Sequence, residues 1–507
     1  MHQSTKHSSD IHDSAISDEL VGMLVSGHRQ VTRPALDRLW EYYRNELDFG
    51  AVDERRPYRA SQEQGLPHRL TRGPGEAARL MESGSGRREI VIENDIAWRL
   101  HTLVDFMFGK PVSIQSLAGD SEKAAAIEQV LTAALDAAGG IGFLQDMALL
   151  GGVYGYVDLL LRVDTAAGKG LGSATGDASA RNAPSKPIDV ERAARLASLF
   201  MIETVEAPRA IPVLDPSDYR RLVGYVVHHT QTLNEVDQGT MLSRLVDRNG
   251  RRRGRLATVD VTEVWTPSEV RIYHDNTLIE RRVNVLGRLP VVHIQNLPQP
   301  FFYEGLSEVE PLIPLQDELN TRLSDRANRV TLQSFKMYLG KGIEDFTERP
   351  ISPGQMWMTD NVDASIEAFG GDAANPSEEA HISEIREAMD KASAVTPVAA
   401  GLLRNKVGNL TSANALRIVM MGLLAKTEKK RQTYGKGIEK VCELVLHALD
   451  VMGVLRTTAA ERRVCLHWPS PLPEDEGQRL RDAEVKLRIG VPREQVLREL
   501  GYGCGDQ

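Results

Sequence analysis

Apolar residues recur every three or four positions over much of the chain, which is the spacing of an amphipathic helix. Runs of this kind predict helices at 16–49, 90–108 and 124–138, and another that begins near residue 142. The second run is followed by Gly109 and Pro111, the order of residues expected just beyond a helix C-terminus. The first 150 residues are therefore expected to be mainly helical.

Alternating apolar and polar residues replace this spacing in the middle of the chain and predict β-strands. A strand is expected at 153–163, and the segment 165–187 that follows has the low complexity of a mobile insert. Further strands are expected at 211–214, 222–230, 261–266, 270–274 and 290–295. Together these patterns predict an α/β body.

From residue 306 an apolar stripe predicts a long helix, and its members lie three or four positions apart. They are Val309, Leu312, Leu315, Leu319, Leu323, Ala327 and Val330. Ser307 and Glu310 suit a capping box at its start. Pro311 and Pro314 either kink the first turn or delay the regular helix until after Pro314. A helix that continues to about Leu339 would be roughly 37 Å long at 1.5 Å per residue, which is long for a globular domain.

The other face of this helix is charged. Its residues Asp317, Arg322, Asp325, Arg326 and Arg329 interleave carboxylates with guanidinium groups. This arrangement is typical of an ion-paired helix face. A catalytic carboxylate pair is disfavoured, because Asp317 and Asp325 are eight positions apart with an arginine between them.

Short strands, a second helix and a loop follow. Residues 336–341 and 355–358 predict strands, and Asn375 with Pro376 suits the first residues of a helix. The apolar stripe of that helix is Ile382, Ile385, Met389 and Ala392. The helix is expected to end before a glycine-punctuated loop at 397–411.

The last part of the chain is also expected to be helical. A helix capped by Thr411 or Ser412 is apolar on nearly all sides over 415–425, and a separate helix covers 438–452. Between them lie the basic residues Lys426, Lys429, Lys430, Arg431 and Lys436. Two more amphipathic segments are expected at 475–489 and 492–500.

Composition limits the class of protein. With 507 residues the chain is long enough for about three domains. Its 41% hydrophobic and 26% charged residues exclude wholesale disorder. The 61 Lys and Arg against 70 Asp and Glu give a formal charge of −9. A protein that coats DNA with its whole surface would be basic, so that function is disfavoured, although a local basic patch is still allowed.

The cysteines and the N-terminus bear on the compartment. Three widely separated cysteines have no zinc-binding spacing and favour a reducing compartment. No apolar run reaches the roughly 18 residues of a membrane span. Residues 1–18 are polar, lack the apolar stretch of a signal peptide, and are expected to be a disordered tail. We therefore expect an intracellular protein with no membrane partner.

The sequence lacks the common catalytic and nucleotide-binding motifs. It contains no metalloprotease helix motif, nucleophile elbow, Walker loop or Rossmann glycine pattern. His228 and His229 are adjacent in an expected strand, so their rings point to opposite faces and cannot share a metal. We therefore expect no catalytic, cofactor-binding or metal-binding residues.

Several short motifs occur in a specific order. They are Asn94, GKP at 109–111, GGVYGY at 151–156, LGRLPVV at 286–292, GLS at 305–307, DELN at 317–320 and LTSANAL at 410–416. In this order and spacing, the chain from about residue 20 onward resembles the portal proteins of tailed double-stranded-DNA bacteriophages, of the siphophage type.

The resemblance implies a predominantly helical α+β fold with four named parts. These are an α/β wing at 19–305, a helical stem at 306–337 and 376–396, a strand-containing clip at 338–375, and a helical crown with the C-terminal helices at 437–507. A tunnel loop at 397–411 and a wing or tunnel helix at 412–436 would join the stem to the crown. The insert 165–187 matches no part of this pattern.

The resemblance also implies a function and partners. Portal subunits form a ring, usually of twelve, at one capsid vertex of the virion, and double-stranded DNA passes through its channel during packaging and ejection. The clip would bind the terminase large subunit and later the head-completion adaptor, while other surfaces contact the major capsid and scaffold proteins. Assembly would take place in the host cytoplasm.

Two groups of residues become candidates for contacts in such a ring. Arg404, Asn405, Lys406 and Asn409 would lie in the tunnel loop beside the DNA. The basic cluster from Lys426 to Lys436 would be an inter-subunit contact or a DNA-facing belt. Two other functions are compatible with the sequence: a nucleic-acid-processing enzyme whose carboxylates meet only in three dimensions, and another structural subunit of a virion.

Overall fold

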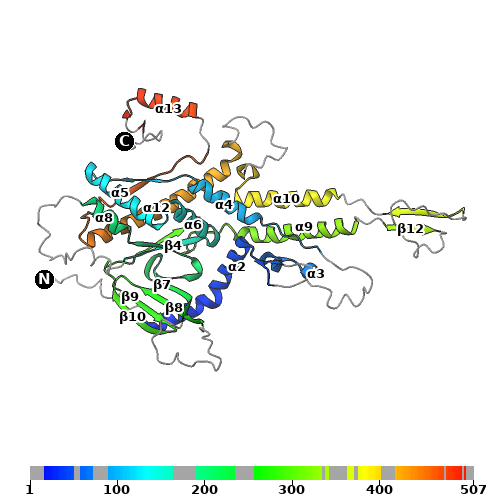
Figure 1. Cartoon of the computed structure of the whole chain (residues 1–507), viewed down its shortest axis with the longest axis horizontal. Coiled ribbons are helices and arrows are strands. Elements are labelled where there is room, and N and C mark those ends of the chain that lie inside the picture. The colour runs from blue at the N-terminus through cyan, green and yellow to red at the C-terminus, as the bar shows by residue number, and fades with distance from the viewer. Residues whose placement is uncertain are drawn as a thin grey trace, which may run out of the picture.

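The computed structural model describes residues 16–50, 58–71, 89–163, 189–234, 256–333, 337–341, 362–369, 375–400, 417–472, 476–493 and 496–497. Within these residues the chain has the expected α+β fold, in which helices predominate. A body of helices and sheets carries two long helices that project from it side by side, and a small sheet lies beyond their far ends (Figure 1). Of the tail predicted at 1–18, residues 1–15 lie outside the described residues, as do the insert 165–187 and residues 401–416. The prediction is wrong for the last three residues of the tail, because Ile16 is buried, Ser17 caps the first helix and Asp18 begins it.

The N-terminal helical pattern is confirmed with different bounds. Helix α1 (Asp18–Gly27), a π-helical turn (His28–Thr32) and α2 (Arg33–Arg44) form one continuous stretch that ends at Asn45 in the left-handed region. The short elements after it are β1 (Leu47–Asp48), β2 (Arg59–Ala60), a 3-10 turn (Ser61–Gly65) and α3 (His68–Thr71).

The next helix begins later than predicted. Helix α4 (Asp95–Phe108) starts after Asn94, whose side chain accepts a hydrogen bond from the Ala97 amide at 3.4 Å. The start expected at residue 90 is wrong, because 89–93 has no helical backbone and lies along a stem helix instead.

Two adjoining helices fill the centre of the body. Helices α5 (Ser121–Ala138) and α6 (Gly140–Tyr154) are joined at Gly139, which has a left-handed φ of 117°. Helix α6 continues through residues predicted as strand, and Gly155 (φ 89°) then reverses the chain into β4 (Tyr156–Arg162). A Cβ atom on Gly155 would overlap the carbonyl oxygen of Gly305, so only glycine fits there.

Two antiparallel sheets pack against these helices. The first has the strand order β11 (Val291–Gln295), β4 and β5 (Met201–Val205). The second has the order β10 (Thr277–Val283), β9 (Glu269–His274), β8 (Leu256–Trp265), β7 (Asp218–Asn234) and β6 (Ala210–Asp215). All the strands predicted between 211 and 295 are confirmed, whereas β5, β10 and helix α8 (Val190–Ala197) were not predicted.

One helix crosses the body where two were predicted. Helix α12 (Met421–Val451) runs without a break, so the division expected near residue 437 is wrong. Gly437 is helical and lies against Ile294 of β11, which shows that this glycine allows close packing rather than ending the helix. Near the C-terminus, β14 (Val464–His467) pairs with β3 (Ser113–Ser116), and α13 (Glu476–Arg488) follows.

The projecting part is a helix–hairpin–helix unit. A 3-10 turn (Glu310–Leu312) leads into α9 (Ile313–Gln333), then come β12 (Met337–Lys341), β13 (Ser365–Phe369) and the returning helix α10 (Pro376–Ser393). Strands β12 and β13 pair antiparallel, from Met337 opposite Phe369 to Lys341 opposite Ser365. Helix α9 is described as far as Gln333 and strand β12 begins at Met337, so the helix does not include residue 337 as predicted; the strand predicted at 355–358 lies outside the described residues. We call α9 and α10 the stem, and β12 with β13 the clip sheet.

The described part of the chain has neither a cluster of metal ligands nor a single helix suited to span a membrane. It contains no group of three or more His, Cys, Asp or Glu side chains placed to hold a metal ion. No single helix in it is long and apolar enough to span a membrane, although α5 and α6 together, across a 65° bend, pass the same test of length and composition.

Candidate functional site at the base of the stem

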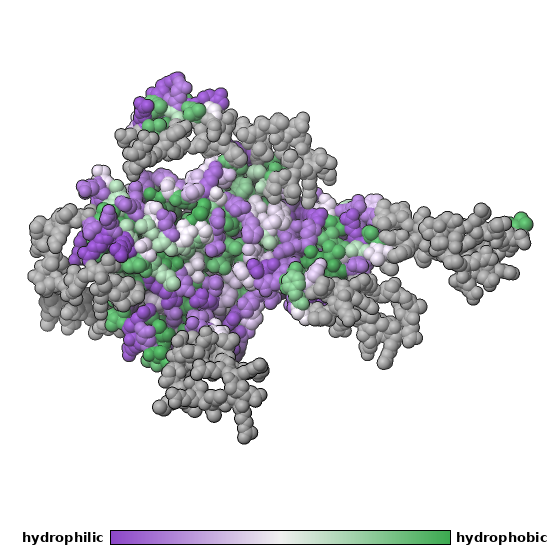
Figure 2. Space-filling view, in the orientation of Figure 1, coloured by the Kyte–Doolittle hydropathy of each residue, from purple (hydrophilic) through white to green (hydrophobic). Residues whose placement is uncertain are grey.

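The stem meets the body where α9 and α10 contact α4, α12 and an extended segment at 89–95. Hydrophilic residues predominate on the visible surface of this junction (Figure 2). Beneath that surface, several charged side chains are almost completely buried: Arg99, Glu308 and Lys430 are exposed by 1%, 3% and 1%. Buried charges are costly unless they are paired, so these contacts determine how the stem is held.

The first contact is a ladder of hydrogen bonds from one face of α9 to the extended segment. The side chains that form it are four residues apart: Gln316, Asn320, Ser324 and Asn328. They accept from the backbone amides of Asp95, Glu93, Val91 and Glu89 at 3.0, 3.0, 3.0 and 2.8 Å. The helix also donates back, for example from Asn328 to the Glu89 carbonyl at 2.8 Å.

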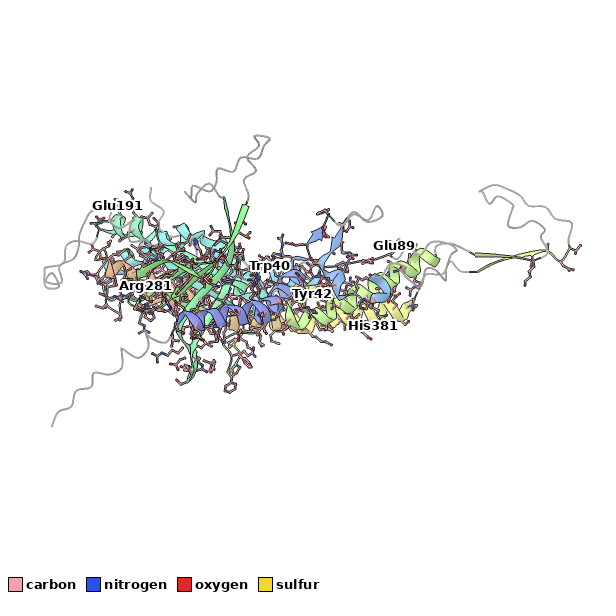
Figure 3. All side chains as sticks on the ribbon, turned by 90° about the horizontal axis from the view of Figure 1, so that it is seen from below. Trp40, Tyr42, Glu89, Glu191, Arg281 and His381 are labelled. Carbon is pink, nitrogen blue, oxygen red and sulfur yellow. The ribbon has the colours of Figure 1, made fainter. Side chains whose placement is uncertain are left out.

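The spacing explains why this ladder fits. Four residues of helix rise about 6.0 Å, and two residues of extended chain advance about 6.8 Å, so alternate backbone groups meet successive turns. Figure 3 shows the outcome, with Tyr42 near the body and Glu89 far out along the stem. The ladder was not predicted from the sequence, although the repeat of amide and hydroxyl residues every four positions was a usable signal.

Four of the five residues on the predicted ion-paired face of α9 form ion pairs. Arg322 pairs with Glu318 at 2.7 Å and with Asp325 at 3.3 Å. Arg326 reaches Glu379 of α10 at 3.7 Å, and Arg329 pairs with Glu378. Partly exposed pairs contribute about 0–1 kcal/mol each, so they align α9 with α10 more than they stabilise the fold.

Asp317 is the exception on this face. Its carboxylate accepts a hydrogen bond from the Tyr42 hydroxyl at 2.8 Å and makes no ion pair with the arginines that follow it. Burial raises the pKa of Asp317, and burial together with this hydrogen bond raises the pKa of Tyr42 to about 12. Asp317 therefore links α9 to α2.

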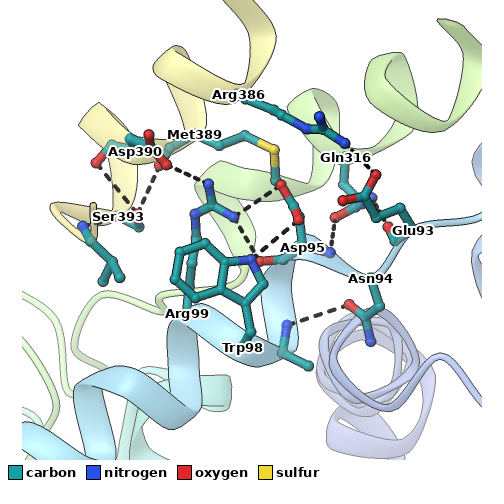
Figure 4. A network of polar contacts seen from close by, with 12 residues as sticks. Glu93, Asn94, Asp95, Trp98, Arg99, Gln316, Arg386, Met389, Asp390 and Ser393 are labelled. Carbon is teal, nitrogen blue, oxygen red and sulfur yellow. Dashed lines mark hydrogen bonds and ion pairs between the residues drawn. The ribbon is translucent and has the colours of Figure 1, made fainter. Parts of the chain in front are cut away.

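A buried arginine joins α4 to α10 (Figure 4). Arg99 contacts the Asp95 carboxylate at 3.1 Å and the Asp390 carboxylate at 2.6 Å, and its guanidinium lies 4.4 Å from the Trp98 ring centre. In the same view Arg386 of α10 pairs with Glu93. Removing one partner of such a buried pair typically costs about 3–5 kcal/mol, so this network is a strong attachment of the stem.

A second buried group joins α12 to the stem. The Glu308 carboxylate, just before α9, pairs with Lys426 and lies 3.5 Å from the Lys430 ammonium. Lys426 also donates to the Ser393 carbonyl at the end of α10 at 2.8 Å. Burial lowers the pKa of Lys430.

The five basic residues near 430 therefore do not form one surface. Lys426 and Lys430 point into the subunit, and Arg431 is half-buried, where it donates to the carbonyls of Phe106 and Pro469. Only Lys429 and Lys436 are exposed. Periodicity identified a basic helix but could not show which of its faces is covered.

The comparison with protein families decides what kind of protein this is. The family model for phage portal proteins of the SPP1 Gp6-like type matches residues 198–500, which is more than half of the chain. The chain belongs to this portal family. As a phage portal protein it is a structural component of the virion and not an enzyme, which confirms the resemblance and sets aside the alternative of a nucleic-acid-processing enzyme.

Two further comparisons were made for this portal. No curated protein sequence matches it. A solved structure described as the virion of a native gene transfer agent particle matches 84% of this chain and 98% of its own, with 12% sequence identity and a TM-score of 0.40.

Of the portal residues that sequence analysis selected, the tunnel-loop candidates Arg404, Asn405, Lys406 and Asn409 lie outside the described residues. The histidine pair is described. His228 is buried, with Nδ1 3.0 Å from the Thr262 hydroxyl, whereas His229 is half-buried and its Nδ1 has no hydrogen-bond partner within the described part.

Proposed function

We propose that this portal assembles into a ring, with twelve subunits as the expected number, whose axial channel carries double-stranded DNA during packaging and ejection. The observation that carries the proposal is the helix–hairpin–helix unit, a stem that projects from the body and presents a sheet at its far end (Figure 1). Together with membership of the portal family, this shape supports a stem, a clip and a wing in the arrangement described above.

The clip sheet is proposed as the docking platform for the terminase large subunit and later for the head-completion adaptor. A two-stranded sheet is marginally stable alone in water and usually requires a further strand or a packed helix. Among the described residues, β12 and β13 pair only with each other. Partner chains at this end would supply the missing contacts.

The net negative charge of the chain supports a channel that does not bind DNA tightly. Each phosphate that a lysine or arginine neutralises adds affinity through counterion release, and strong affinity would oppose transport. With a formal charge of −9 per chain, twelve copies carry about −108. Exposed carboxylates on the outer face of α10, such as Glu384 and Glu387, agree with this.

Of the two basic groups selected from the sequence, four residues remain as candidates for contacts with DNA or a neighbouring subunit. In the proposed ring, Arg404 and Lys406 of the tunnel loop 397–411 are adjustable contacts with DNA, flanked by Asn405 and Asn409. Lys429 and Lys436, exposed on α12, face either the DNA or a neighbouring subunit. The wing contacts the major capsid and scaffold proteins, first in the host cytoplasm and then in the virion.

Mass photometry and negative-stain microscopy of the purified chain test the ring. A twelvefold assembly of 56.1 kDa subunits has a mass of about 673 kDa, and an axial hole should be visible. If the chain purifies as a monomer, the same measurement is repeated with scaffold and capsid protein present. A compact dimer without a hole under both conditions would contradict the proposal.

DNA transport is tested separately in a packaging assay. Arg404→Ala and Lys406→Ala rings are expected to assemble normally but to package less DNA than the unmodified ring. Arg195→Ala, at an exposed position of α8 in the body, serves as a control for loss of a basic residue away from the loop and the clip sheet. Normal packaging by both loop variants would contradict the role proposed for residues 397–411.

A further inference from the structure

The end of the stem and the start of α12 meet at one point of the body. Val395, just after α10, and Leu423, in the first turn of α12, are exposed by 0% and 1% and pack together with Leu103 of α4. Gly422 is close enough that its Cβ, if present, would lie 3.8 Å from the Cβ of Ala394. The chain thus leaves the stem and returns to the body at adjacent positions.

Lys426 connects the two sides of this meeting point. Its ammonium donates to the carbonyl of Ser393 in the last turn of α10, at 2.8 Å. Carbonyls in that turn lack helical partners and carry the negative end of the helix dipole, so they favour a cation. The same ammonium pairs with Glu308, whose chain enters α9.

Glu308 is itself fixed to the body. Its amide donates to the Gly152 carbonyl at 2.9 Å, and the neighbouring Ser307 hydroxyl donates to the Val153 carbonyl at 2.5 Å, so two bonds hold it on the last turn of α6. Its side chain is exposed by only 4%. The carboxylate is therefore a rigid anchor for the ammonium groups around it.

The group contains one cation more than it needs for neutrality. Lys430, whose side chain is 1% exposed, already offers Glu308 a positive partner at 3.5 Å. Lys426 is the member that also reaches α10. Removing Lys426 leaves a neutral buried pair, whereas removing the carboxylate would leave two buried cations without a counter-charge.

We infer that Lys426 is a positioning residue: with Glu308 as its anchor, it holds the start of α12 against the end of α10. Its importance for transport rests on the proposed function, because in that ring the chain between these two helices lines the DNA path. The contacts themselves do not depend on that role, so the two can be tested apart.

The test compares full-length Lys426→Met with Lys440→Met, which removes an exposed lysine from the same helix. Amide hydrogen exchange is followed by mass spectrometry in peptides covering 389–400 and 417–430. Loss of a charge-assisted hydrogen bond is expected to speed local exchange roughly ten- to hundredfold in Lys426→Met. Exchange in α5 and β7, and all exchange in Lys440→Met, should match the unmodified protein.

Lys426→Arg is the conservative variant, since it keeps a cation within reach of Glu308 and Ser393, and it should restore part of the protection. Equal exchange in Lys426→Met and Lys440→Met would overturn the inference. So would failure of Lys426→Met to fold, because Lys430 would then not suffice to neutralise Glu308.

A packaging assay on the same variants separates the inference from the proposed function. Faster local exchange with reduced packaging supports both. Faster local exchange with packaging at the unmodified level supports the positioning role of Lys426 and contradicts the role proposed for this part of the ring in transport.

Discussion

At the scale of single residues, burial controls the protonation of three histidines around the five-stranded sheet. The pKa values of His28, His228 and His229 are all lowered from 6.5, chiefly by burial. The folded state thus favours their neutral forms, and below about pH 6.5 the unfolded chain binds more protons than the folded one. The free energy of unfolding therefore keeps its full value above that pH, where these histidines are neutral in both states. It decreases as the pH falls below that value.

This predicts a steeper acid destabilisation in the unmodified protein than in a His228→Asn variant. The melting temperature, measured between pH 7.5 and 5.5, should fall in both but less in the variant. His68→Asn, which changes an exposed histidine, should leave the slope unchanged. Parallel slopes for His228→Asn and the unmodified chain would show that His228 does not lose its charge on folding.

A second feature at this scale is a carboxylate buried where the body meets the loop that enters the stem. Asp158 is exposed by 0% and accepts from the hydroxyls of Tyr225 and Tyr303 at 2.8 and 2.9 Å. His293 also contacts it, at 2.7 Å. Burial raises the pKa of both tyrosines well above 10, so their hydroxyls stay protonated and remain donors.

Tyr303→Phe is expected to lower the stability of the fold by about 1.5–3 kcal/mol, because a hydrogen bond to a buried carboxylate is lost. The midpoint of urea unfolding measures this effect. Tyr58→Phe changes a tyrosine that is 45% exposed, and it should change the free energy of unfolding by less than about 0.5 kcal/mol. Similar midpoints for the two variants would mean that the Asp158 cluster is not a stabilising centre.

At the scale of elements, two glycines of α12 should respond in opposite directions to alanine. Alanine in a helix interior is favoured over glycine by about 0.8–1.0 kcal/mol. At Gly437, however, the new methyl group would overlap Ile294, which is exposed by 1% and cannot move aside. Overpacking of this kind costs about 1–3 kcal/mol, so Gly437→Ala should lower the melting temperature.

Gly422→Ala is the matched comparison, because Gly422 is exposed and the nearest atom to its new Cβ would be at an ordinary contact distance of 3.8 Å. It should raise the melting temperature slightly. If both variants are stabilised, β11 is not packed as tightly on α12 as the structure indicates.

The ladder on α9 gives another prediction for an element. Asn320 is exposed by 0%, accepts from the Glu93 amide and donates to Gln62 at 3.0 Å. Asn320→Ala leaves these groups unpaired, at a cost of about 1–3 kcal/mol. Hydrogen exchange at 89–95 should accelerate, whereas Val330→Ala, on an exposed position of the same helix, should leave it unchanged.

The elements also show what the sequence could and could not predict. Regular apolar spacing predicted α4, α9 and α10, because each buries one continuous stripe. Strand β10 was missed because all seven of its residues are exposed and leave no alternation. At the junction, periodicity assigned Lys430 to a helix, but its partner Glu308 lies 122 positions earlier, and only the folded chain brings them together.

At the scale of the whole molecule, the stem joins the body through few but strong contacts. Arg99, the ladder of α9 and the Glu308 group bind it from three sides. The ladder continues along α9 to Asn328, level with the ion pairs between α9 and α10, and the clip sheet lies beyond them. This distribution suits a rigid ring that leaves its outer end free to accept partner chains.

The same distribution predicts that the clip can be removed without loss of the ring. Arg329 near the end of α9 pairs with Glu378 near the start of α10, so a short Gly-Ser linker can join the two helices in place of 337–372. Mass photometry should then show an assembly with the same number of shorter subunits and an axial hole. Binding of the terminase large subunit and the head-completion adaptor, followed by co-sedimentation, should be lost together with packaging. If the shortened ring still binds its partners, the docking platform lies on the stem or the wing. If the ring itself is lost, neighbouring clip sheets hold the subunits together.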